Sequence, residues 1–179
     1  DPPSEDDQVT FEVDLIPEKQ MRINRVLWKL GGSHLSLSGD YPLSAGDDIT
    51  FQVSVPTLSL DDVGIKSKPA GFVARGSLKG KLQAKISKKD LTPATLSGEI
   101  KGERLSFALP FLPFPVRDCD FSALFSGDKI VIPSLTMMTG GSSLKGKGEF
   151  KGWKGLKGAL TVTSSSLDLS DFVGPGQVR

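Results

Sequence analysis

The chain has 179 residues and a formal net charge of +1, because 22 lysine and arginine side chains are balanced by 21 carboxylates. Nucleic-acid binding needs a clear excess of basic side chains, so this balance argues against nucleic acid as a partner. The single cysteine, Cys119, excludes an intrachain disulfide, and no apolar run approaches the roughly 20 residues of a membrane-spanning helix.

Regular alternation of apolar and polar residues begins near the N-terminus. Residues 1–8 (DPPSEDDQ) are acidic and proline-rich and are predicted to be a linker. From residue 9 onward the two residue classes alternate, as in 9–15, 49–55 and 119–125. Such alternation is typical of half-buried antiparallel strands. Because no methionine or signal peptide precedes Asp1, we expect the sequence to be part of a longer protein.

Helical periodicity does not extend over three turns anywhere in the sequence. Only residues 59–64 and 168–174 are expected to form single turns, with Ser or Asp as the cap and glycine as the stop. The fold is therefore predicted to be all-β. We expect an antiparallel meander of repeated strands that forms a curved, twisted sheet or groove with little helix.

Two lysine-rich stretches, 78–86 (LKGKLQAKI) and 144–150 (LKGKGEF), follow the same period of two. Their lysines fall on one face and their leucines, glycines and Phe150 on the other. A shift by one residue would bury the lysines, so the apolar face sets the register. We interpret the lysines as solvated faces; a weak attraction to anionic headgroups is the alternative.

The segment PFLPFP at 110–115 is predicted to be extended, because each proline restricts its own backbone and that of the preceding residue. We interpret it as an apolar plug over one end of the sheet. The alternative is a ligand for a proline-recognising groove.

An internal repeat relates the two halves of the chain. The Gly-Gly-Ser sequences at 31–33 and 140–142 set a spacing of 109 residues, which also superposes 51–62 on 160–171. In both copies the apolar parity changes at the same repeat position, Asn24-Arg25 and Pro133-Ser134, which predicts a β-bulge there. The predicted organisation is the tail of one unit (9–66) followed by a complete unit (67–175).

Four stretches of the sequence resemble the AsmA-like proteins of the bacterial envelope. They are GSLKGKLQAKIS, LSGEIKGERLSFALPFLPFP, FSGDKIVIPSLTMMTGGSSLKGKG and LTVTSSSLDLSDFV, which together cover most of 67–175. The motifs consist of glycine placement and alternation, and they contain no catalytic signature. The resemblance implies a long twisted sheet folded into a groove, anchored to the inner membrane and projecting into the periplasm.

The resemblance also implies a role in outer-membrane homeostasis, in which phospholipid acyl chains lie along the groove. From parity we expect the lining to be Leu78, Leu82, Ile86, Leu96, Ile100, Leu144, Phe150, Leu160 and Val162. Glycines on the same face, such as Gly80 and Gly146, are expected to leave room for a ligand. The alternative is a purely structural spacer, or a module that binds envelope proteins.

Catalytic chemistry is not indicated. The only histidine, His34, falls on a polar face beside a turn, and Cys119 shares the parity of Phe121 and is expected to be a small buried hydrophobe. One His and one Cys cannot form a zinc cluster, and the sequence has no phosphate-binding loop. We therefore expect no enzyme activity, no metal and no cofactor.

Overall fold

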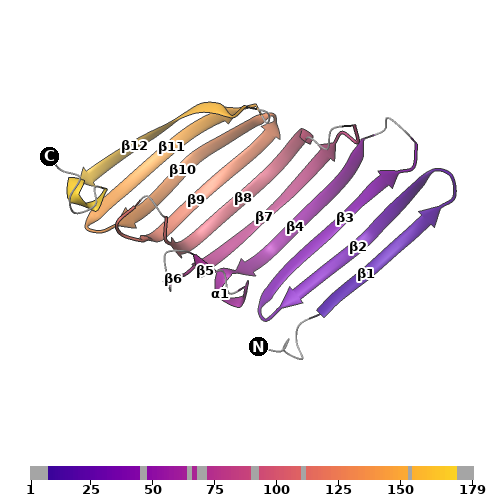
Figure 1. The fold of residues 1–179 in the computed structure, drawn as a ribbon, viewed down its shortest axis with the longest axis horizontal. Coiled ribbons are helices and arrows are strands. Elements are labelled where there is room, and N and C mark those ends of the chain that lie inside the picture. The colour runs from indigo at the N-terminus through magenta and orange to yellow at the C-terminus, as the bar shows by residue number, and fades with distance from the viewer. Residues whose placement is uncertain are drawn as a thin grey trace.

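The computed structural model describes residues 8–44, 48–63, 66–67, 72–89, 93–109, 112–152 and 155–172. They form one open antiparallel sheet of ten strands that lie side by side almost in chain order (Figure 1). In spatial order the strands are β1 (Gln8–Ile16), β2 (Gln20–Leu30), β3 (Ser33–Pro42), β4 (Ile49–Ser59), β7 (Arg75–Ile86), β8 (Pro93–Phe107), β9 (Val116–Gly127), β10 (Lys129–Thr139), β11 (Ser142–Lys151) and β12 (Lys157–Ser166).

Little else is present in the described part of the chain. A two-stranded sheet, β5 (Lys66–Ser67) with β6 (Phe72–Val73), and two single turns, α1 (Leu60–Val63) and η1 (Leu169–Asp171), lie at the ends of the long strands. The two turns fall inside the segments predicted to be short helices. The structure confirms the all-β antiparallel meander. Of the predicted linker 1–8, only Gln8 is described, as the first residue of β1.

The lysine-rich strands are oriented as their alternation predicts. In β7 the lysines at 79, 81 and 85 are exposed, whereas the leucines at 78 and 82 are half-buried. In β11, Lys145 and Lys147 are exposed while Leu144 is buried. The apolar face therefore sets the register in both strands.

Both predicted β-bulges are present. Ile23 pairs with Gly39 and Val26 with Leu37, so Asn24 and Arg25 of β2 lie opposite a single residue of β3. In β10 the same arrangement occurs between Ile132 and Leu135, where Pro133 and Ser134 lie opposite one residue of β11. An extra residue at these points returns the apolar parity to the same face of the sheet.

The pairing register itself repeats with the 109-residue spacing. Every printed pair between β2 and β3 has its counterpart between β10 and β11, from Gln20 with Pro42 and Lys129 with Lys151 onward. The pairs between β3 and β4 recur between β11 and β12 in the same way. The correspondence therefore extends from the sequence to the hydrogen-bonded register of three consecutive strands.

A hydroxyl–carboxylate contact fixes the same turn in each copy. The Ser33 hydroxyl donates to Asp62 Oδ2 at 2.7 Å and accepts the backbone N–H of Ser59 at 2.7 Å. In the second copy the Ser142 hydroxyl donates to Asp171 Oδ2 at 2.7 Å and accepts the N–H of Asp168 at 2.9 Å. Each contact ties a Gly-Gly-Ser hairpin to the short turn that follows the next strand.

The best-buried apolar cluster lies where the central strands β4, β7, β8 and β9 begin or end. It consists of Leu60, Ala74, Leu105, Val116 and Cys119. Leu109 and Leu112, on either side of the undescribed residues 110–111, pack against this cluster. Of the predicted plug 110–115, the described residue Leu112 thus contributes to an apolar cover, whereas Phe114 remains 45% exposed.

Candidate functional site: one apolar face along ten strands

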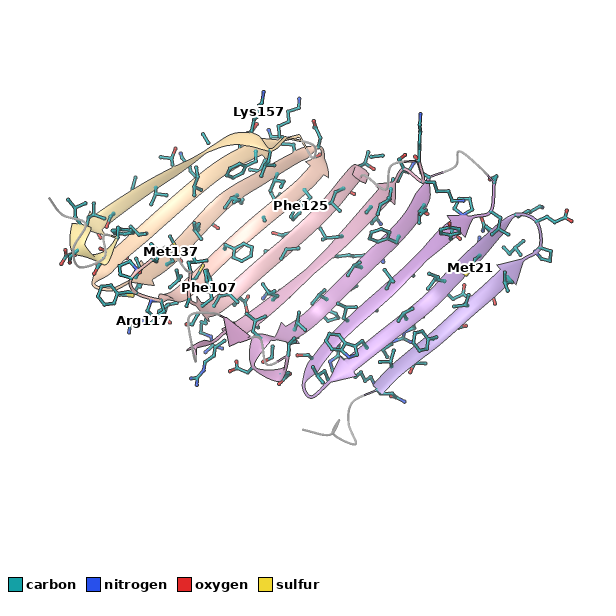
Figure 2. All side chains as sticks on the ribbon, in the orientation of Figure 1. Met21, Phe107, Arg117, Phe125, Met137 and Lys157 are labelled. Atoms are coloured by element: carbon teal, nitrogen blue, oxygen red, sulfur yellow. The ribbon has the colours of Figure 1, made fainter. Side chains whose placement is uncertain are left out.

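An unbroken row of apolar residues and glycines crosses the whole sheet. Directly paired residues of neighbouring strands point to the same face, so the pairing register identifies the members of this row. From β1 to β12 they are Phe11, Val26, Leu37, Val53, Leu82, Gly98, Phe125, Ile130, Phe150 and Gly158. In Figure 2, which draws the side chains of both faces, Phe125 lies near the middle of the sheet and Met21 near its β1 end.

The nine residues predicted from parity all lie on this face. Leu82 and Phe150 belong to the row itself, and the others lie in parallel rows two, four or six residues away along their strands. The connecting pairs are Ile49 with Ile86, Leu58 with Leu78, Ala84 with Leu96, Gly80 with Ile100, Met137 with Leu144, Gly148 with Leu160, and Gly146 with Val162.

Strand β4 supplies part of the surface that the prediction omitted. Val53, Val55 and Leu58 surround a small apolar pocket together with Leu78, Leu82 and Ile100, and its volume is about 80 Å³. The signal was present in the sequence, because 49–55 alternates regularly and Val53 aligns with Val162 in the repeat. The nine predicted residues all belong to the second unit, 67–175, whereas Val53, Val55 and Leu58 belong to the first.

This face is covered in one region and open elsewhere. The cluster around Leu105 and Val116 buries this face at the ends of the central strands, where Leu109 and Leu112 pack against it. Away from it most apolar side chains are only half-buried, and on the outermost strands they are exposed, with Phe11 at 69%, Leu160 at 44% and Val162 at 43%. The single layer in Figure 1 explains this exposure, because no described helix lies over the face.

The glycines of the face do not leave the room that was expected. A Cβ added at Gly80 would lie 2.3 Å from the Glu99 carbonyl oxygen, and one at Gly98 would lie 2.0 Å from that of Lys81. At Gly102 it would meet the ring of Phe121 at 2.4 Å. These glycines allow close approach of the neighbouring strand or of a bulky cross-strand side chain. A ligand on this face would therefore lie along its surface rather than fill glycine-lined holes.

The opposite face is polar, and several of its charges are paired across strands. Arg22 Nε lies 2.9 Å from Asp40 Oδ1, Lys129 Nζ lies 2.8 Å from Glu149 Oε1, and Lys79 pairs with Glu103. The Lys101 ammonium and, secondarily, the Ser122 hydroxyl bond the exposed Glu99 carboxylate and lower its pKa. Carboxylates therefore neutralise several of the basic residues of this face.

Two wide hollows lie over this polar face. One, of about 530 Å³, is lined in part by Arg22, Asp40, Gln52 and Gln83, and the other, of about 610 Å³, lies near Lys101. In the first, the Gln83 amide donates to Gln52 Oε1 at 3.0 Å and Arg22 pairs with Asp40. These groups already interact with one another, and we assign no ligand to either hollow.

Charge reversal on the polar face should leave the fold intact. We expect Lys81→Glu, Lys145→Glu and Lys147→Glu each to change the free energy of unfolding by less than about 0.5 kcal/mol, because all three side chains are exposed. Urea unfolding followed by circular dichroism measures this change. Loss of cooperative folding in these variants would mean that the two faces are assigned the wrong way round.

The residues considered for chemistry are placed as expected. His34 is exposed beside the hairpin, and its Nδ1 lies 3.2 Å from the Gly32 carbonyl oxygen. Cys119 is 3% exposed within the apolar cluster. Burial, with a smaller contribution from the nearby Asp120 charge, raises the pKa of its thiol to about 11. A buried thiol of this kind is a weak nucleophile at neutral pH.

Within the described residues no three His, Cys, Asp or Glu side chains are grouped as metal ligands would be. No helix in that part of the chain is long and apolar enough to cross a membrane. Comparisons of the chain with protein-family models, with curated proteins and with solved structures found no match.

Proposed function

We propose that this chain is a non-catalytic β-groove segment of the AsmA-like type, which binds or conducts phospholipid acyl chains in the bacterial periplasm. In this proposal it belongs to an inner-membrane-anchored protein that serves outer-membrane biogenesis and homeostasis. Its partners are phospholipid, the membrane through an anchor outside this sequence, and envelope proteins. The observation that carries the proposal is the apolar row across ten strands of a single-layer sheet.

Physical chemistry favours an apolar occupant for such a face. A one-layer sheet must bury its apolar side against something, and large exposed apolar patches usually mark interaction surfaces. Acyl chains would lie along the half-buried side chains of β4 and β7, with headgroups in water. Burial is worth about 0.8 kcal/mol per methylene, so affinity should rise with chain length and depend little on headgroup or salt.

One observation favours the alternative of a structural spacer or protein-binding module. The pocket at Leu82 holds only about 80 Å³, whereas sites for small ligands usually span about 300–1,000 Å³. Acyl chains therefore need the open surface of the face. If another protein layer covers that surface, the sheet serves as a scaffold instead.

The test is native mass spectrometry of the purified chain together with photo-crosslinking in vesicles of phosphatidylethanolamine and phosphatidylglycerol. We expect lipid adducts from a photoreactive residue at Leu82, on the apolar face, and none from the matched position Lys81, on the polar face. Adducts at both positions, or at neither, would contradict the proposal.

A charge on the apolar face provides the second arm of the test. Leu82→Glu should abolish the adducts at a nearby photoreactive position, because an unpaired carboxylate among acyl chains costs several kcal/mol. Lys81→Glu is the control. Leu82 is more suitable than Leu144, which is 5% exposed and whose replacement would also disturb packing. Adducts that persist in a folded Leu82→Glu variant would show that lipid contact does not depend on the apolar face and would contradict the proposal.

A further inference from the structure

The internal repeat relates the edge strand β12 to β4, and it thereby identifies the kind of strand that pairs at this position. Strands β4 and β12 occupy equivalent positions, because each follows the equivalent strand, β3 or β11, in the same register. Beyond β4 the sheet continues with β7, whereas β12 is the last strand on its side (Figure 1). Within the part of the chain that the structure describes, no strand therefore covers the edge of the second copy that β7 covers in the first.

Burial at equivalent positions shows the same difference. Leu60 of α1 is 8% exposed and belongs to the apolar cluster with Ala74, the residue that leads into β7. Its equivalent in η1, Leu169, is 69% exposed. Leu58, which pairs with Leu78 of β7, is half-buried, whereas its equivalent Leu167 is 56% exposed. Leu167 and Leu169 are therefore exposed in the second copy. Their equivalents in the first copy, Leu58 and Leu60, are covered by β7 and by Ala74, which precedes it.

Between Lys157 at its start and the irregular pairing near Ser165 at its end, β12 has none of the features that protect an edge strand. Residues 157–166 contain no proline, and after Lys157 they contain no charge. Edge strands that do not pair usually carry such residues, since an open row of backbone N–H and C=O groups recruits another strand. Edge β1, by contrast, carries Glu12 and Asp14.

We propose that the β12–η1 edge is a docking site for a free antiparallel strand with the pattern of β7, contributed by a further repeat unit of this kind. A second folded copy of this chain cannot supply its own β7, because that strand is already paired with both β4 and β8. The inference depends on register and burial alone and is independent of what the apolar face binds.

The register of the docked strand follows from the β4–β7 pairs. Val53 pairs with Leu82 and Phe51 with Ala84, so Val162 should pair with the incoming Leu82 equivalent and Leu160 with the Ala84 equivalent. Leu167 should meet the Leu78 equivalent, as Leu58 meets Leu78. Docking would extend the apolar face and place the incoming lysines on the polar face.

Disulfide trapping with a synthetic peptide of residues 74–87 tests the register. We expect a Val162→Cys chain to cross-link to a peptide carrying Leu82→Cys and not to one carrying Lys81→Cys, whose side chain lies on the other face. For the unmodified peptide, Val162→Glu should weaken binding about a hundredfold, because the glutamate would be buried opposite leucine. Thr161→Glu, on the polar face of the same strand, should leave the affinity nearly unchanged.

A fusion protein that carries the strand covalently avoids the self-association to which a free peptide is prone. Residues 67–109 appended after Arg179 should slow amide exchange in β12 by about tenfold at alternate residues. Unprotected β12 amides in this fusion, or cross-linking of Lys81→Cys as readily as Leu82→Cys, would overturn the proposal. Protection of β12 in the unmodified chain that increases with concentration would overturn it in favour of edge-to-edge pairing between copies.

Discussion

Replacing Gly98 with alanine is expected to lower the free energy of unfolding by about 3 kcal/mol or more. Gly98 has a backbone φ of +131°, a conformation that side-chain-bearing residues rarely adopt. Its added Cβ would also lie 2.0 Å from the Lys81 carbonyl oxygen in the neighbouring strand. Both effects act at the centre of the sheet, where β7 and β8 pair. Urea denaturation followed by circular dichroism measures the change.

Gly127→Ala is the matched control for the Gly98 variant. Gly127 also has a positive φ, +65°, but a Cβ there would have nothing within 4 Å. We expect a cost of only about 1–2 kcal/mol, which is the usual penalty for a left-handed conformation. The difference between the two variants reports the steric contact with β7 together with the less favourable φ of Gly98. Equal losses would show that the sheet relaxes around Gly98 and that the close approach is not rigid.

Asp171→Ala is expected to cost about 2–3 kcal/mol, because the buried Ser142 hydroxyl loses its acceptor, whereas the N–H of the exposed Gly141 can bond to water instead. The Asp171 side chain accepts the Ser142 hydroxyl at 2.7 Å and the Gly141 N–H at 2.9 Å, both at Oδ2. Ser142 is fully buried and Asp171 is 5% exposed, so water cannot readily replace the carboxylate. Thermal unfolding measures the loss. Asp171→Asn retains one carbonyl oxygen and should cost less.

The equivalent change in the first copy, Asp62→Ala, is the internal control. Asp62 accepts the Ser33 hydroxyl at the same distance, 2.7 Å, but its own side chain is exposed. Water can take over part of its role, so we expect a smaller loss, about 1 kcal/mol. A loss equal to that of Asp171→Ala would indicate that burial does not set the strength of this contact.

The faces of the strands, the bulges and the repeat can be predicted from the sequence. Alternation with a period of two fixes which side chains share a face, and burying lysine costs enough to fix the register of β7 and β11. The change of parity at Asn24-Arg25 and at Pro133-Ser134 predicted both bulges, because a bulge is a local feature of the chain. The nine residues chosen from parity share one face for the same reason.

What covers that face depends on contacts between residues that are distant in the sequence. Leu60 and Leu169 occupy the same position in the repeat, yet one is 8% exposed and the other 69%. Alternation predicts the face of the sheet on which a side chain lies. How far that side chain is buried depends on residues from elsewhere in the chain, which for Leu60 include Ala74 beside β7. Local sequence also does not predict the space at the glycines. The carbonyl oxygen of Lys81, which excludes a side chain at Gly98, belongs to the neighbouring strand. Local sequence therefore specified the sheet, and contacts between distant residues determined how much of its apolar face stays open.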